Sequence, residues 1–252
     1  MEIVQSSPTL ADSKPRIPSW LDLILYLVVG FGGFFAVSAL VGALVKTDQI
    51  TLPLSLLAYA LNIIFFAGTA LILGAARGKL NLRDIGFYPP RIDAKWFFFA
   101  IAISLALLPL RGIIGVVVQL LAGGTLNGLQ GRMDVIAPDG FTWLGFVITL
   151  IGAGILVPIS EELFFRGAIF MWFRQRYNFP VAMLASSFLF AFGHFDTIGV
   201  VASSLVLALA NAYVLEKSKT LWAPILMHIT TNSFAVVMIY AALAFYPQAL
   251  QR

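Results

Sequence analysis

Two glutamates and two histidines stand within otherwise apolar stretches in the last hundred positions of this chain. Glu161, Glu162, His194 and His228 are two of its four glutamates and both of its histidines. Ionisable side chains inside a bilayer are costly and by default indicate a functional site. A carboxylate and imidazoles that lie close together have the chemistry needed to activate water for hydrolysis.

The two adjacent glutamates are expected to play different parts. Glu162 and Arg166 stand four residues apart, the spacing at which side chains meet on one helix, so we interpret them as a structural ion pair. Helical pitch turns Glu161 by about 100° from Glu162, away from the arginine. A buried carboxylate without a local counter-charge is a competent general base. Glu161 is therefore the candidate base.

A second pair of polar residues could hold the negative charge that develops during hydrolysis. His228 and Asn232 lie four apart and present an imidazole and an amide N–H on one helix face, a combination that suits an oxyanion. His194 follows Gly193, where the missing side chain allows another backbone or a substrate to approach closely.

The elements that must position these residues are membrane helices. Apolar residues make up 60% of the 252 and charged residues 11%, and the mean hydropathy is +0.93, far above that of a soluble domain. Apolar stretches of about 20 residues or more, long enough to span a bilayer, run from Leu23 to Val45, from Leu52 to Ala76 and from Trp96 to Ala122.

The absence of cysteine excludes disulfides, thiolate metal sites and a cysteine nucleophile. We attribute the net charge of +4 to orientation and to contact with anionic membrane lipids rather than to nucleic acid.

The number of spans depends on the mostly apolar run from Trp143 to Arg176, which contains Pro158. These 34 residues would form a helix ~51 Å long against a hydrocarbon core of about 30 Å, so length favours two helices. One helix kinked at Pro158 instead places eleven basic residues on one face of the membrane and three on the other, whereas two helices give eight and six. The positive-inside rule therefore favours one kinked helix and about seven spans, with eight as the alternative.

The predicted fold is all-α, a polytopic transmembrane helical bundle in a prokaryotic plasma membrane, with the N-terminus and the basic loops in the cytoplasm. Residues 1–20 are polar and proline-containing, which predicts a flexible cytoplasmic tail before a single transmembrane domain over residues 21–252. Leu80 to Phe87 is expected to lie on the membrane surface. The last three helices are predicted over Pro180–Phe195, Thr197–Leu215 and Leu221–Tyr246.

Counting residues from the cytoplasmic helix ends gives the depth of each candidate. Glu161 and His194 fall at one level, ~21 to 23 Å from those ends, but His228 and Asn232 reach only ~11 to 17 Å. Convergence of all four requires a tilted last helix or one whose first residues are already buried.

Two other ionisable residues near these helices belong to no motif. Arg111, beside Pro109, is expected to be structural and to pair with a lipid phosphate, Asp134 or a helix carbonyl. Asp196 follows His194 at a helix boundary, where capping the next helix and orienting His194 remain equally open.

Three ordered motifs resemble those of the CAAX protease and bacteriocin-processing family of intramembrane endopeptidases, also called the Abi family, which includes the type II CAAX prenyl endopeptidases. The motifs are Glu161-Glu162 with Arg166, Phe190 with His194, and His228 with Asn232. The resemblance covers residues 142–240.

This resemblance implies an intramembrane endopeptidase in which Glu161 and His194 activate water while His228 and Asn232 stabilise the oxyanion, with Glu162 and Arg166 in support. Metal-free hydrolysis is favoured over a zinc enzyme with Glu161, His194 and His228 as ligands, because no His-Glu-x-x-His motif is present and asparagine is a poor zinc ligand. The expected partners are membrane lipids and a peptide or protein substrate, lipidated or not. The sequence leaves the substrate and the oligomeric state open.

Two other functions compete with proteolysis. A family member without catalysis would act by binding a partner membrane protein, but every motif residue is present. A proton-coupled transporter would also bury carboxylates and histidines, yet it usually shows an internal repeat, and we find none.

Overall fold

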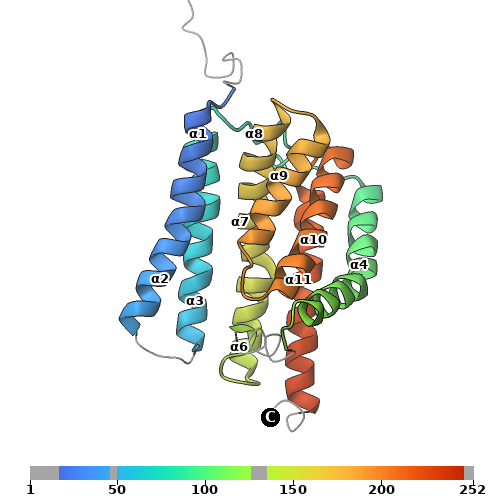
Figure 1. The fold of residues 1–252 in the computed structure, drawn as a ribbon. Coiled ribbons are helices and arrows are strands. Elements are labelled where there is room, and N and C mark those ends of the chain that lie inside the picture. Colours follow the sequence, from blue (N-terminus) through green and yellow to red (C-terminus); the bar gives the residue numbers. More distant parts are fainter. Residues whose placement is uncertain (1–16, 46–49, 126–134, 247–252) are drawn as a thin grey trace, which may run out of the picture.

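The computed structural model describes residues 17–45, 50–125 and 135–246, which form helices joined by turns (Figure 1). Among these described residues, six helices are long and apolar enough to span a membrane, and α9 (Phe179–Phe192) is apolar but has only 14 residues. The chain is therefore an integral membrane protein with the all-α bundle predicted from its sequence. The seven predicted helices correspond to these six and α9.

Several of the helices combine α-helical parts with stretches of π-type backbone hydrogen bonding. The first comprises α1 (Trp20–Leu25), a π-helix (Tyr26–Gly32) and α2 (Gly33–Val45), and the second comprises α3 (Leu52–Asn62) and two π-helices (Ile63–Ala67 and Thr69–Ala75). The third is α4 (Ala94–Leu121), and after α9 follow α10 (Ile198–Ser218) and α11 (Trp222–Phe245). The fourth comprises α6 (Trp143–Thr149), a π-helix (Leu150–Leu156), α7 (Val157–Glu162), a second π-helix (Leu163–Phe170) and α8 (Met171–Arg174).

The fourth helix settles the ambiguity over the span count in favour of one helix. It runs without a break for 32 residues from Trp143 to Arg174. Pro158 stands in the first turn of α7, directly after a π-helix. Proline has no N–H to donate, and the wider turns before it are a common way for a helix to pass such a residue. At ~48 Å this helix is longer than the hydrocarbon core, so it tilts or extends into the head-group region.

The start of the bundle lies slightly earlier in the chain than predicted. Most of the predicted tail, residues 1–16, lies outside the described residues, but Ser19 caps α1 through a capping box with Asp22. The indole of Trp172 donates to the Ser19 carbonyl at 2.8 Å, and the Arg176 guanidinium donates to the carbonyl of Pro18. Tertiary contacts therefore hold the chain in place from Pro18 onward.

The segment from Leu80 to Phe87, which was expected to lie on the membrane surface, packs against the helix bundle. Leu80 and Ile85 are buried and belong to the main apolar core. Phe87 stacks on Trp222 with ring centroids 5.4 Å apart. Apolar side chains of this loop are covered by helices, a tertiary contact that its local sequence does not indicate.

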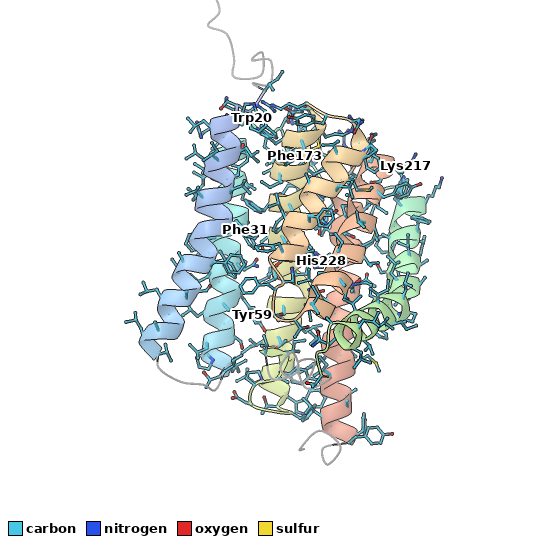
Figure 2. All side chains as sticks on the ribbon, viewed as in Figure 1. Trp20, Phe31, Tyr59, Phe173, Lys217 and His228 are labelled. Atoms are coloured by element: carbon cyan, nitrogen blue, oxygen red, sulfur yellow. The ribbon has the colours of Figure 1, made fainter. Side chains whose placement is uncertain are left out.

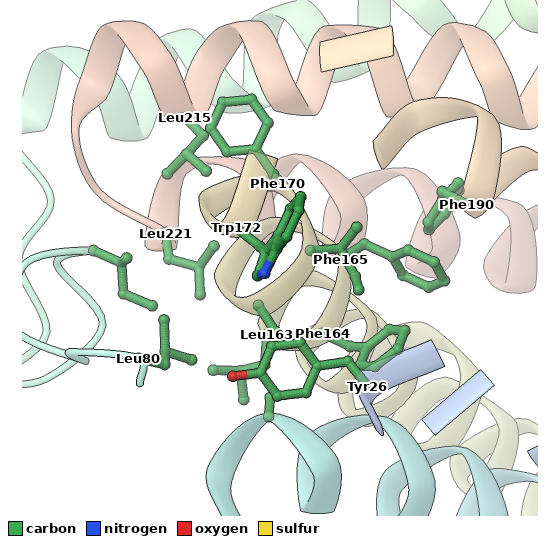
Figure 3. Packing of buried hydrophobic residues seen from close by; sticks show 14 of the residues in the cluster. Tyr26, Leu80, Leu163, Phe164, Phe165, Phe170, Trp172, Phe190, Leu215 and Leu221 are labelled. Carbon is green, nitrogen blue, oxygen red and sulfur yellow. The ribbon is translucent and has the colours of Figure 1, made fainter. Parts of the chain in front are cut away.

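The main apolar core lies between the first two helices, the second half of the fourth helix and the helices that follow it. Figure 3 shows its large side chains, among them Phe164, Phe165 and Trp172 of the fourth helix and Tyr26 of the first. This packing holds the fourth helix, which carries the glutamates, in the interior of the bundle.

A short helix and a bent helix create space at mid-depth. With 14 residues, α9 is ~21 Å long, and the turn after it ends well inside the bundle (Figure 1). Pro109 lies inside α4, which bends and packs against α10 and α11. The backbones of α4 and α10 approach closely where Gly115 faces Gly199, and the Gln119 side chain accepts a hydrogen bond from Gly199 N at 3.1 Å.

Candidate active site

Glu161 and Glu162 end the short α7 segment, with π-helical stretches on either side. Interruptions of this kind within α-helices are frequent at functional sites. Both glutamates are buried, as are Arg166 and His228. Figure 2 shows His228 in the interior of the bundle, far from Trp20 and Lys217 at the end where the basic loops lie.

The ion pair predicted between Glu162 and Arg166 is present. Arg166 Nε lies 3.2 Å from Glu162 Oε2, and both side chains are fully buried. The guanidinium also donates to the carbonyl of Ala208 at 2.9 Å and lies over the Phe190 ring, 4.7 Å from its centroid. Glu162 is therefore neutralised from its own helix, as the four-residue spacing indicated.

The other oxygen of Glu162 holds two side chains from later helices. Oε1 accepts a hydrogen bond from Asn211 Nδ2 at 2.8 Å and lies 2.9 Å from His228 Nδ1. Because a carboxylate that pairs with arginine only accepts hydrogen bonds, Nδ1 of His228 carries the proton in this contact. This contact orients the imidazole so that Nε2 lies 3.7 Å from Glu161 Oε2. That separation is longer than a hydrogen bond but within the range of an ion pair.

Among the described residues Glu161 makes no ion pair with Arg166, and its hydrogen-bond partner comes from another helix. Asn62 Nδ2 donates to Glu161 Oε1 at 3.0 Å. The Ser160 hydroxyl donates to the Oδ1 of the same asparagine. The local pattern around Glu161 could not supply this partner, because Asn62 lies at the end of α3.

Sequence reasoning therefore missed Asn62 and Asn211. A signal was present, since each is an asparagine in a long apolar run, and polar residues in membrane helices usually bond across a helix interface. A search of the apolar runs that included amide side chains as well as charged ones would have found both asparagines.

His194 lies directly after α9, at the mid-depth turn. Its Nδ1 lies 2.9 Å from the carbonyl oxygen of Phe190. A carbonyl only accepts hydrogen bonds, so Nδ1 is the protonated nitrogen and Nε2 is the basic one in the neutral ring. The ring also packs against the Phe190 ring, with centroids 4.6 Å apart. These contacts define both the tautomer and the direction of the imidazole.

Glu161, His194 and Asn232 line one cavity of about 550 Å³, while Nδ2 of Asn232 donates to the carbonyl of Ala153 at 3.2 Å. A second cavity, of about 230 Å³, has mainly phenylalanine walls. Four residues border both cavities: Phe34, Asn62, Glu161 and His194. The carboxylate and the imidazole therefore lie where the two cavities meet.

The structure brings the predicted residues together with one exception to the expected geometry. His228 lies among the carboxylates of Glu161 and Glu162, whereas Asn232 borders the cavity. Among the described residues, His228 does not line that cavity, so the two side chains do not present their N–H groups to one point. Their spacing on one helix was correct, but the partner helices direct them differently.

The last helix reaches this depth because it starts inside the protein. Leu221 is fully buried, and its backbone N–H donates to the carbonyl of Ile85 at 2.7 Å. Of the two arrangements that could let the four candidate residues converge, the buried start is therefore present. The loop that packs into the bundle covers the beginning of α11.

A zinc site was considered from the sequence. Within the described residues, no three histidine, aspartate or glutamate side chains gather closely enough to hold a metal ion. The nearest arrangement is His228 between two glutamates, with one ring nitrogen directed to Glu162. As they lie, the residues do not fit a tetrahedral site that leaves a position for water.

Comparison with known proteins identifies relatives of the segment that carries these residues. Residues 143–234 match the profile of a family described as type II CAAX prenyl endopeptidase Rce1-like. A Bacillus subtilis protein named "Putative membrane peptidase YdiL" is 32% identical over 91 residues. That alignment covers 36% of this chain and 37% of the relative, so the chain matches little more than a third of its relative's length. No solved structure matches the chain significantly.

Proposed function

We propose that this chain is an intramembrane endopeptidase of the CAAX protease and bacteriocin-processing family, a proposal supported by the match of residues 143–234 to the type II CAAX prenyl endopeptidase Rce1-like family. The observation that carries the proposal is the shared cavity. A buried carboxylate, an imidazole with a defined tautomer and an amide donor border one space of about 550 Å³. That volume is in the range of ligand-binding cavities, about 300 to 1,000 Å³.

In the proposed reaction Glu161 acts as general base on a water molecule in the cavity, and His194 helps to orient that water. The oxygen of the water attacks the peptide carbonyl carbon while its proton passes to the carboxylate. The C–N bond then breaks, and the proton goes to the departing amine. The Asn62 hydrogen bond to Oε1 orients the carboxylate throughout.

The carbonyl oxygen becomes negatively charged when water attacks, and the proposed donors to it are Asn232 and His228. Nδ2 of Asn232 has a second hydrogen besides the one donated to Ala153. Nε2 is the ring nitrogen of His228 that Glu162 does not hold, and it lies 3.7 Å from Glu161 Oε2, so it is the nitrogen proposed to donate to the oxyanion. In this proposal His228 turns from Glu161 toward the cavity to reach the oxyanion.

The proposed substrate is a peptide or a membrane-associated protein, lipidated or not, of the kind handled in CAAX-type or bacteriocin-related processing. The proposed location is a prokaryotic plasma membrane with the N-terminus in the cytoplasm. These assignments rest on the family and on the distribution of basic residues.

Cleavage of a quenched-fluorescence peptide library by the purified protein in detergent tests the proposal. Glu161→Gln keeps the side-chain shape but removes the base, and we expect activity to fall by about 10² or more. Glu216→Gln is the matched control, because this glutamate pairs with Arg174 and Lys219 outside the cavity. A chelator, followed by added zinc, tests the metal alternative in the same assay.

Loss of cleavage in Glu161→Gln but not in Glu216→Gln supports the assignment of Glu161 as the general base. Full activity of that variant would show that another group is the base. If the folded wild-type protein cleaves nothing in the library, partner binding without catalysis becomes the better account. If the chelator inhibits cleavage and added zinc reverses that inhibition, a zinc mechanism becomes the better account.

A further inference from the structure

Arg111 and Asn211 are polar residues of the membrane helices that have no task in the proposed hydrolysis. Arg111 donates from Nε to the carbonyl oxygen of Ser203 at 3.0 Å. The helix carbonyl considered from the sequence is therefore among its partners, while Asp134 lies outside the described residues. Asn211, by contrast, bonds directly to a residue of the proposed site.

Asn211 is fully buried on α10. A buried amide is costly unless it is hydrogen-bonded, and in a membrane helix its partner usually lies on another helix. Nδ2 donates to Glu162 Oε1 at 2.8 Å, on the fourth helix. Among the described residues, those that line the two cavities do not include Asn211. Any effect of this side chain on the reaction therefore passes through Glu162.

The carboxylate of Glu162 is held at both of its oxygens. Oε2 lies 3.2 Å from Arg166 Nε, and Oε1 receives the amide of Asn211. A carboxylate held at one oxygen can still turn, because rotation about its last single bond has broad minima. Donors on both oxygens, supplied by two different helices, fix its plane.

The oxygen that Asn211 bonds is also the oxygen that orients His228. Oε1 of Glu162 lies 2.9 Å from His228 Nδ1. A carboxylate oxygen has two lone pairs, so with Asn211 on one of them the other accepts from the imidazole in a fixed direction. Nδ1 then keeps its hydrogen for Glu162, and Nε2 is the nitrogen left for the reaction, 3.7 Å from Glu161 Oε2.

Helix α10 anchors the other half of the ion pair as well. Arg166 donates through Nη2 to the carbonyl oxygen of Ala208 at 2.9 Å. Ala208 and Asn211 stand three residues apart, the spacing that places both on one face of a helix. One face of α10 therefore holds the arginine through a carbonyl and the glutamate through an amide.

We propose that Asn211 is a positioning residue for the hydrolysis, which sets the tautomer and the direction of the His228 ring through the Glu162 carboxylate. The juxtaposition that carries this inference is that of Asn211 Nδ2 and His228 Nδ1 on one oxygen of Glu162. The inference rests on the proposed function, because it takes His228 as a donor to the oxyanion. Asn211 acts only through Glu162 and is not itself a catalytic residue.

Nitrogen NMR of the histidine rings tests the positioning without depending on turnover. The chain has two histidines, His194 and His228, so labelling histidine with the heavy nitrogen isotope gives the signals of two rings. The sample is the full-length protein in detergent, purified through a tag without histidine, and His194→Gln assigns the signals. A ring nitrogen that carries hydrogen and one that does not resonate far apart, so the spectrum reports the tautomer of each neutral ring.

Two substitutions remove the amide in different ways. Asn211→Leu replaces it with an apolar side chain, and Asn211→Ser leaves a shorter hydroxyl that can bond to a carbonyl of its own helix. The second variant keeps the test usable if the first does not fold. Ser186→Ala is the matched control on the neighbouring α9, because it also removes a buried polar group, whose hydroxyl donates to the Met183 carbonyl at 3.4 Å.

We expect the unchanged protein to show the Nδ1–H tautomer of His228. In both Asn211 variants its two ring signals should move toward each other, because the ring then exchanges between tautomers, while the signals of His194 stay in place. In the cleavage assay kcat should fall about tenfold with little change in KM. Ser186→Ala should change none of these quantities.

Unchanged His228 signals in a folded Asn211 variant would overturn the inference, because Asn211 would then have a packing role only. Shifted signals with an unchanged kcat would overturn it as well, since the reaction would not depend on the orientation of the ring. The two readouts separate this inference from the proposed function. Shifted signals in a protein that cleaves nothing refute the proposed function, whereas unchanged signals in an active protein refute the positioning alone.

Discussion

Asn62 donates a hydrogen bond to Glu161 across 3.0 Å, although 99 positions separate the two residues in the chain. The contact joins the second helix to the fourth, and it lies where the two cavities meet. The segment that resembles known peptidases starts at residue 143, so part of the proposed site comes from outside that segment.

Replacing Asn62 by alanine should slow the reaction rather than weaken substrate binding. The carboxylate of Glu161 would lose the donor that orients it, and we expect kcat to fall about tenfold with little change in KM. Steady-state cleavage measurements give both constants. The matched control is Asn178→Ala, which removes the cap of α9 far from the cavity. An unchanged kcat in Asn62→Ala would limit Asn62 to a packing role.

Removing one partner of the buried ion pair should destabilise the fold strongly. Arg166→Gln leaves Glu162 as an uncompensated buried charge, and such losses typically amount to about 3 to 5 kcal/mol. Arg174→Gln breaks a partly exposed pair with Glu216, which is worth about 1 kcal/mol or less. Unfolding in mixed detergent micelles compares the two variants. Similar stabilities would show that Arg166 contributes no more than a surface residue.

The close approach of α4 and α10 predicts a contrast between two glycines. A Cβ at Gly199 would lie 2.4 Å from the carbonyl oxygen of Gly115, so Gly199→Ala must push the helices apart. We expect a loss of about 1 to 3 kcal/mol in stability. Gly112 has open space around its Cβ position, and Gly112→Ala should be neutral or slightly stabilising because alanine favours the helix. Equal effects of the two substitutions would argue against the contact.

The predicted orientation can be tested with single cysteines, since the natural sequence has none. Lys217 lies at the end of the bundle with the basic loops (Figure 2), and Tyr246 follows α11, which ends at the other end of the bundle (Figure 1). In intact cells a membrane-impermeant maleimide should label Tyr246→Cys but label Lys217→Cys only after permeabilisation. The opposite result would invert the topology and place the N-terminus outside.

The sequence by itself determined the class of fold and most of the helix boundaries. Length and hydropathy identify membrane helices because the bilayer sets the number of apolar residues that a helix needs. The distribution of basic residues correctly favoured one helix from Trp143 to Arg174 over two. The four-residue spacing of Glu162 and Arg166 was enough to predict their ion pair, because both lie on one helix and the helical pitch alone sets their separation.

Tertiary structure decided what surrounds those residues. Asn62 meets Glu161, and Asn211 meets Glu162, only because separate helices pack in a particular register, which helical periodicity within one segment does not encode. The direction of His228 was decided in the same way, since two carboxylates of another helix orient its ring. The cavity itself exists because α9 is short and α4 bends beside it. Its shape therefore depends on how helices fill space together, a property that no single stretch of sequence contains.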